Sequence, residues 1–349
     1  AVLISVAIGF YRIFHTVKSN KAFSDLEHNY QNDELLENES LSELEEFKAF
    51  LRDLIMHGAV GTALGGVCTI VGEPQNLLIA GVVGWSFVEF FIAMAPITMP
   101  VLVAGICTCF IIERFKLAGF GNQLPLSIRS IFNDYDDYEN SQQTDQQRAE
   151  LLVEFIVLIF LIIALALHLA AVGVIGLAVI ILLTSFKGIT DEHKLGDAFH
   201  EALPFTALLA VFFAIVSVIH DQHLFSPVIN YVLLQDPSIQ PSVFFMANGI
   251  LSAISDNVFV ATIYINEINQ AYLANTITRD QFEALAVAVN TGTNIPSIAT
   301  PNGQAAFLFL LTSSLAPLIN LSYLKMVKMA LPYTIILTIV GLYSITYLL

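Results

Sequence analysis

One stretch of uncharged polar residues, 289–304, interrupts an apolar sequence and carries the side chains best suited to bind a small ion. It reads V-N-T-G-T-N-I-P-S-I-A-T-P-N-G-Q. Amide and hydroxyl oxygens are hard ligands, and by extension from the rule for Ca²⁺ and Mg²⁺ they suit Na⁺. The candidate ligands in the stretch are Asn290, Thr291, Thr293 and Asn294. Any one of them can instead bond a neighbouring helix, but their clustering around Gly292 and Pro296 favours an ion site.

The negative charge for such a site comes from Asp256. Ser255, Asp256 and Asn257 separate two apolar arms, 243–254 and 258–268, that are each too short to span a bilayer. This pattern predicts a re-entrant hairpin with a polar tip, to which Asn257 adds an amide oxygen. An acidic residue inside a membrane costs about 2.5–3.5 kcal/mol on insertion scales, which favours a functional role.

Two roles are open for Asp256, and they are compatible. Burial favours the protonated acid and a bound cation favours the carboxylate, so Asp256 can hold a cation or a proton, one at a time. Asp is also a preferred N-cap, and Asp256 precedes a predicted helix. We favour the ion role, because Ser or Asn would cap the helix without the charge.

A second polar interruption occurs at 61–76 and contains Glu73. It shares a plan with 291–302: a Gly/Thr-rich entry, a small polar middle, and a proline beside an amide. The matching positions are Pro74 and Asn76 in the first interruption, and Pro301 and Asn302 in the second. Glu73 is either a second carrier of a cation or proton, or an acceptor of backbone N–H groups at the break. We favour the second role.

Composition places these interruptions in a membrane. Of the 349 residues 56% are hydrophobic and only 13% are charged, against roughly 25% charged in a soluble domain. Uncharged runs approaching the ~20 residues of a membrane span lie at 97–112, 155–186, 203–219 and 329–349. The run 155–186 is too long for one crossing, so we expect two helices that turn near 168–173. The sequence predicts an all-α polytopic membrane protein.

Other classes of protein find little support. The three cysteines lack metal-ligand spacing, and the net charge of −16 argues against nucleic acid as a partner. The sequence contains no zinc-protease, phosphate-loop or nucleophile-elbow motif, so we expect neither an enzyme nor a cofactor.

Positive charges predict the topology. Lys and Arg occur at 12–52, 114–148, 187–194 and 325–328, with Arg279 as the only other one. If each interrupted segment crosses once and the hairpin does not cross, all four basic regions lie on the cytoplasmic side. The two interruptions then run in opposite directions, which is typical of inverted-repeat transporters.

The expected organisation follows from this topology. The chain starts at Ala1 inside an apolar run, so we expect an N-terminal part, including the first hairpin, to be missing. The segments are a limb of that hairpin at 1–14, an acidic cytoplasmic loop with an amphipathic helix at 15–53, a first broken helix and a transmembrane helix at 54–113, a second acidic loop at 114–150, scaffold-type helices at 151–240, the re-entrant hairpin at 241–272, a second broken helix at 282–320 and a final transmembrane helix at 329–349.

The motifs resemble those of NhaB-type sodium/proton antiporters of bacterial inner membranes. The resemblance covers essentially the whole chain, and its strongest strings are G-E-P-Q-N at 72–76, S-D-N-V-F at 255–259, N-T-G-T-N at 290–294 and T-P-N-G-Q at 300–304. The strings T-D-E-H at 190–193 and A-L-P-Y-T at 330–334 extend it.

That resemblance implies a scaffold domain that dimerises in the lipid and a transport domain of two hairpins and two broken helices. It further implies electrogenic export of Na⁺ and Li⁺ in exchange for H⁺, with elevator-like movement. The family's first hairpin, whose tip also carries an Asp, has no counterpart here, so Asp256 would supply only half of the carried-over site.

Two alternatives remain open at this stage. One is a Na⁺-coupled dicarboxylate carrier of the same architecture, although Asp256 would repel a dianion. The other is a membrane scaffold that binds partners through its acidic loops, for example through 134–139.

Overall fold

The computed structural model describes residues 2–19, 38–189 and 231–349, together with scattered residues between 190 and 230. In these parts all regular structure is helical. The long helices are α1 (Val2–Lys18), α2 (Asn38–Gly66), α4 (Phe87–Arg114), α5 (Leu126–Gln142), α6 (Asp145–Ala166), α7 (Val172–Phe186), α10 (Gln240–Ile254), α11 (Asn257–Leu273), α12 (Arg279–Asn294) and α15 (Tyr323–Tyr347). Shorter helices are α3 (Pro74–Val83), α13 (Ala305–Thr312) and α14 (Leu315–Leu318), and two 3₁₀ turns lie at Pro296–Ala299 and Pro301–Gly303.

Local sequence signals explain many of the helix boundaries. Ser86 and Thr144 each begin a helix with a capping box, and Thr278 caps α12 by accepting the backbone N–H of Gln281. Helix α3 begins with Pro74, whose missing N–H costs nothing at the first helical position, and ends at Gly84 with a φ of 85°.

Among the described residues, three helices are long and apolar enough to cross a membrane: α4, α6 and α15. The 28 residues of α4 extend about 42 Å, more than the ~30 Å hydrocarbon core. The predicted turn inside 155–186 is confirmed, because α6 ends at Ala166 and α7 begins at Val172. The predicted apolar segment 203–219 lies outside the fully described residues.

Helix α2 differs from the sequence expectation. We expected an amphipathic helix to end near residue 53 and a membrane segment to begin at 54, but one helix runs from Asn38 to Gly66. Leu44, Phe47, Leu51 and Ile55 are all buried in the core. Their spacing of three or four residues keeps one apolar face in phase across the expected boundary, so nothing interrupts the helix.

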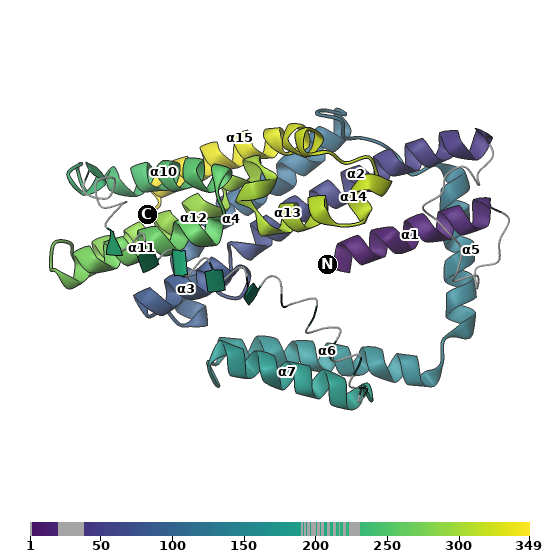
Figure 1. Cartoon of the computed structure of the whole chain (residues 1–349), viewed down its shortest axis with the longest axis horizontal. Helices are drawn as coiled ribbons and strands as arrows, with labels where there is room; N and C mark the ends of the chain where they lie inside the picture. Colours follow the sequence, from purple (N-terminus) through teal and green to yellow (C-terminus); the bar gives the residue numbers. More distant parts are fainter. Residues whose placement is uncertain are drawn as a thin grey trace.

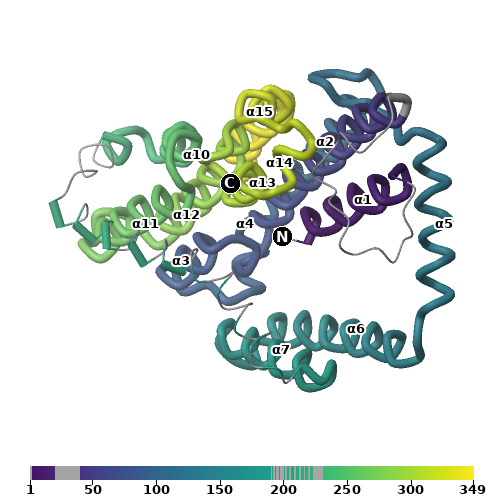
Figure 2. Tube along the Cα trace, turned by 45° about the vertical axis from the view of Figure 1, so that its right-hand side comes forward, coloured from purple at the N-terminus to yellow at the C-terminus, as the bar shows by residue number. Residues whose placement is uncertain are grey.

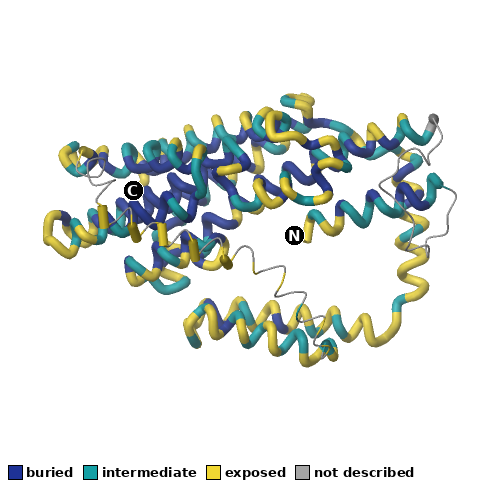
Figure 3. The backbone as a smooth tube through the Cα atoms, in the orientation of Figure 1, coloured by how far each residue is buried: buried dark blue, intermediate teal, exposed yellow. Residues whose placement is uncertain are grey.

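The helices form an elongated bundle with one hairpin set apart from it. Figures 1 and 2 show α5 running across the bundle direction and leading to α6 and α7, which lie side by side. A small apolar cluster of Ala164, Leu165 and Ile175 packs against Phe87 at the start of α4. Elsewhere α6 and α7 are largely exposed (Figure 3).

The deepest part of the bundle is the second half of α12. Every residue from 285 to 298 is buried, and this region is dark blue in Figure 3. Helix α10 packs along α12 so closely that a Cβ on Gly292 would lie 2.6 Å from the carbonyl oxygen of Phe245. A polar segment is therefore enclosed by protein on all sides.

Candidate functional site

The structure brings three regions where helices begin or end together in this enclosed part of the bundle. They are the end of α2 with the following turn and Pro74, the end of α12, and the junction of α10 and α11 at Ser255 and Asp256. Gln75 Nε2 donates to Asn294 Oδ1 at 2.7 Å, which joins the first interruption to the second. Asn257 Nδ2 lies 3.5 Å from Glu73 Oε2, which joins the first interruption to the hairpin tip.

Glu73 supplies a carboxylate at the centre of this meeting point. It is only 6% exposed, and its side-chain partners are the amides of Gln75 and Asn257, both at the long limit of 3.5 Å. No Lys, Arg or His within the described residues forms an ion pair with it. A buried carboxylate so weakly paired is costly unless a proton or a cation neutralises it.

The sequence expectation for Glu73 is wrong in one respect. Glu73 occupies the N-cap position of α3, but its side chain makes no capping hydrogen bond. The turn before α3 is held instead by Asn76, whose Nδ2 donates to the carbonyls of Gly66 at 2.8 Å and Thr69 at 2.7 Å. The Glu73 carboxylate is thus left available to the site.

Asp256 does cap α11, as one of its two predicted roles requires. Its Oδ1 accepts the backbone N–H groups of Val258 at 2.8 Å and Phe259 at 3.1 Å. Both bonds use the same oxygen, so Oδ2 takes no part in the cap. Asp256 is half-buried and lies close enough to Glu73 for the two carboxylates to repel each other.

The side chains of the four predicted ligands on α12 have different hydrogen-bond partners. The hydroxyls of Thr291 and Thr293 donate to carbonyls one turn back in their own helix. Asn290 Nδ2 contacts Met94 Sδ at 3.4 Å. Asn294 is central, since its Nδ2 also reaches Asn76 Oδ1 at 3.4 Å.

Proline and glycine shape the second interruption. Pro296 and Pro301 each begin a 3₁₀ turn, and a Cβ on Gly249 of α10 would lie 2.5 Å from Pro296 Cγ. Asn302, in contrast, is exposed and does not contribute to the site.

Sequence reasoning missed two glutamines. Gln75 joins the two interruptions, and Gln304 Nε2 donates to the Asn294 carbonyl at 2.7 Å and to Ser297 Oγ at 3.1 Å. Gln75 lies between Pro74 and Asn76, and Gln304 follows Pro301 and Asn302 after one glycine. That position in the proline–amide motifs is the signal that could have identified both.

Several buried oxygens in and beside the site lack a hydrogen-bond donor within the described residues. They are Gln75 Oε1, Asn257 Oδ1, Asn290 Oδ1 and Gln304 Oε1. Buried acceptors are normally paired, and uncharged oxygens beside a carboxylate are the ligands that a hard cation prefers. The arrangement can therefore hold a small cation or, on a carboxylate, a proton.

Comparison with known proteins gives the family. A family profile described as "Bacterial Na+/H+ antiporter B (NhaB)" matches residues 1–349. The chain belongs to the NhaB family.

Curated relatives agree with this assignment, and each is named Na(+)/H(+) antiporter NhaB. The protein of Shewanella frigidimarina (strain NCIMB 400) is 61% identical over 340 residues, which are 97% of this chain and 64% of the relative. That of Saccharophagus degradans is 59% identical over 345 residues, 99% of this chain and 69% of the relative. That of Marinomonas sp. (strain MWYL1) is 58% identical over 349 residues, 100% of this chain and 70% of the relative.

Membership settles the broad class of this protein. NhaB proteins are multi-pass membrane transporters, not enzymes, and no cofactor is expected for the family. The chain spans about two thirds of the length of these relatives.

Proposed function

We propose that this chain forms the ion-binding part of an electrogenic antiporter that exchanges cytoplasmic Na⁺, and also Li⁺, for external H⁺ across the bacterial inner membrane. The observation that carries the proposal is the buried, weakly paired Glu73 carboxylate, which lies beside the Asp256 hairpin tip and uncharged oxygens from both interruptions. The relatives' name adds independent support. Such a protein contributes to sodium and pH homeostasis.

In this proposal Asp256 and Glu73 are the groups that carry charge. Each holds either a share of the cation or a proton, because two neighbouring carboxylates without a cation repel each other. Asn257 links the two carboxylates, since it directly follows Asp256 in the chain and its Nδ2 lies 3.5 Å from Glu73 Oε2. Release of Na⁺ therefore favours uptake of protons at the same place, which is the basis of exchange.

Helix dipoles assist this chemistry. Glu73 and Asp256 lie at the N-termini of α3 and α11, where the positive ends of the dipoles stabilise negative charge. Helix α12 ends at Asn294 in the same region, and the negative end of its dipole there favours a cation.

We further infer that α2–α3 and α12–α13 are broken transmembrane helices of an inverted repeat, and that alternating access is of the elevator type. The contact between Gln75 and Asn294 across the two interruptions supports this inference. A second copy of the protein and the surrounding lipid are the proposed partners.

Proton flux in proteoliposomes of the complete natural protein tests the proposal. Addition of Na⁺ should drive proton movement in the wild type, and Asp256→Asn or Glu73→Gln should abolish it. The matched control is Asp136→Asn, because Asp136 is exposed on α5, and it should behave as the wild type.

Other outcomes would identify the alternatives. Uptake of labelled dicarboxylate that requires Na⁺ would overturn antiport in favour of an anion carrier. Unchanged flux in Asp256→Asn together with loss of function on deleting 134–139 would favour a scaffold.

A further inference from the structure

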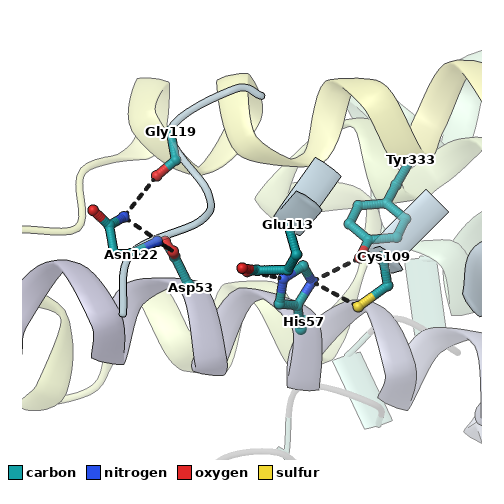
Figure 4. A network of polar contacts seen from close by, with 7 residues as sticks. All are labelled: Asp53, His57, Cys109, Glu113, Gly119, Asn122 and Tyr333. Carbon is teal, nitrogen blue, oxygen red and sulfur yellow. Dashed lines mark hydrogen bonds and ion pairs between the residues drawn. The ribbon is translucent and has the colours of Figure 1, made fainter. Parts of the chain in front are cut away.

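A second polar cluster lies apart from the ion site, where α2, α4 and α15 meet (Figure 4). His57 on α2 is its centre, with a side chain only 17% exposed. Its Nε2 lies 2.7 Å from Glu113 Oε1 on α4, and its Nδ1 lies 2.6 Å from Tyr333 Oη on α15. One imidazole thus joins three helices.

The partners of His57 can accommodate both of its protonation states. In the neutral ring, Nε2–H donates to Glu113 and Nδ1 accepts the hydroxyl proton of Tyr333. In the imidazolium both nitrogens donate, and the Tyr333 oxygen becomes an acceptor, because a phenol can play either role. The Cys109 sulfur, 3.6 Å from Nδ1, is a further neighbour of that hydroxyl.

The strength of the connection between helices differs between the two states. Protonated His57 forms a charge-assisted pair with Glu113, and such pairs are roughly twice as strong as neutral hydrogen bonds. Phe120 covers the ring at 4.4 Å in a stacked arrangement and keeps water from one face. Helix α2 is therefore held more firmly against α4 when His57 carries a proton.

Other charged groups also lie near His57. Asp53 interacts electrostatically with both His57 and Glu113, and its Oδ1 has no hydrogen-bond partner within the described residues. Asp53, one turn earlier on α2, accepts from the backbone N and the side chain of Asn122 at 2.9 and 3.0 Å. Arg52 donates to the carbonyl of Ile319 at 2.7 Å, and Lys325 is close enough to Asp53 to interact electrostatically. Neither cation forms an ion pair with Glu113 within the described residues, so His57 is its partner.

Helix α2 connects this cluster to the ion site. Gly66, nine residues after His57, lies about 14 Å further along the helix axis. There the helix packs on the site directly, since a Cβ on Gly66 would lie 2.9 Å from Glu73 Cγ. A change in how α2 is held at His57 is therefore transmitted to the wall beside Glu73.

We propose that His57 is a proton-binding site separate from the transported-ion site, and that its protonation state controls how firmly α2 is held against α4 and α15. Deprotonation weakens the His57–Glu113 pair and frees α2 to move beside Glu73, so exchange accelerates at alkaline pH. Only the effect on the rate of Na⁺/H⁺ exchange rests on the proposed function. The effect of His57 protonation on helix packing does not.

Thermal unfolding of the purified full-length protein tests the proposal without transport. Histidine changes charge between about pH 5 and 8, so the midpoint is measured at both ends of this range. Wild type should exceed His57→Gln by about 2–4 °C at the acidic end, and the difference should be smaller at the alkaline end, where only the bonds of the neutral ring remain. Glu113→Gln should behave as His57→Gln, and the exposed His168→Gln should follow the wild type.

Two further measurements complete the test. Amide hydrogen exchange in α2 of the wild type, corrected for the intrinsic rates, should be slower at acidic pH. This measurement uses only the wild type, so it does not depend on whether a variant folds. In proteoliposomes, His57→Gln should retain exchange but lose part of its pH dependence. The inference is overturned if the difference in unfolding midpoint is constant with pH, or if amide hydrogen exchange in α2 does not depend on pH. Absence of any Na⁺-driven proton flux in the wild type would overturn only the proposed function.

Discussion

Asn294 is the side chain through which the two interruptions touch. It accepts from Gln75, donates to Asn76 and to the carbonyl of Asn290, and offers its own carbonyl to Gln304. Because all of these groups are buried, none can exchange its partner for bulk water.

A substitution of Asn294 therefore tests two contributions of this side chain, one to stability and one to ion binding. Asn294→Ala should lower the free energy of unfolding by about 1–3 kcal/mol, because the Gln75 amide loses its acceptor, and should weaken Na⁺ activation of proton flux. Denaturant titration and flux at graded Na⁺ concentrations measure the two effects. The control is Asn302→Ala, since Asn302 is exposed; equal losses in both variants would contradict the assignment.

Residue types alone predicted that several of these side chains lie close together; that they bind an ion stays a prediction. Glu73, Asp256, Asn257, Asn290 and Asn294 do lie in one region, because charged or amide side chains inside an apolar sequence must be gathered. The bonds from the Thr291 and Thr293 hydroxyls to carbonyls of their own helix were not predictable. A threonine in a helix can bond its own backbone or a neighbouring group equally well.

At the scale of elements, the close approach of α10 and α12 positions the second interruption. Gly292 makes the approach possible, since a Cβ there would lie 2.6 Å from Phe245 O and 2.9 Å from Phe245 Cα. Both of these are backbone atoms, which cannot turn aside as a side chain can.

Gly292→Ala should therefore push α10 from α12 and destabilise the protein by about 1–3 kcal/mol. The same change should reduce proton flux, because it displaces the helix that ends at Asn294. Gly65→Ala is the matched control: Gly65 is also helical, but a Cβ there meets nothing within 4 Å. If the two variants have equal unfolding midpoints, the close approach does not position the site.

The spacing of apolar residues predicted the bounds of the helices better than the local content of charged residues did. The turn between α6 and α7 could be predicted because 155–186 exceeds one crossing. The continuity of α2 was missed because the charges from Glu43 to Asp53 suggested a loop, although Leu44, Phe47 and Leu51 continue the spacing of Ile55.

At the scale of the whole molecule, polar contacts gather at two opposite ends of the bundle. At one end Arg52 donates to Ile319 O, and Asp53 accepts from Asn122. At the other, Arg279 donates to Val83 O at 2.8 Å and lies over the rings of Tyr272 and Phe282. Arg279, the only basic residue outside the four basic regions, thus has a structural role, and the predicted orientation need not be revised on its account.

Single cysteines test that orientation in intact cells. In a cysteine-free full-length protein, Leu117→Cys should react with a membrane-impermeant maleimide only after the cells are opened, because the positive-inside rule places this loop in the cytoplasm. Thr276→Cys should react from outside. Both positions are exposed. Labelling of both from the same side would contradict the topology.

The burial of residues 285–298 on every face also limits which substitutions this stretch can tolerate. A lipid-facing helix accepts almost any apolar replacement on its outer side, and we expect the exposed residues of α6 and α7 to be of that kind. The enclosed stretch has no outer side, so each position must satisfy a fixed volume and, at its polar residues, a fixed set of partners. In a deep mutational scan we expect it to appear as an unbroken block of intolerance, with no periodicity of three or four residues.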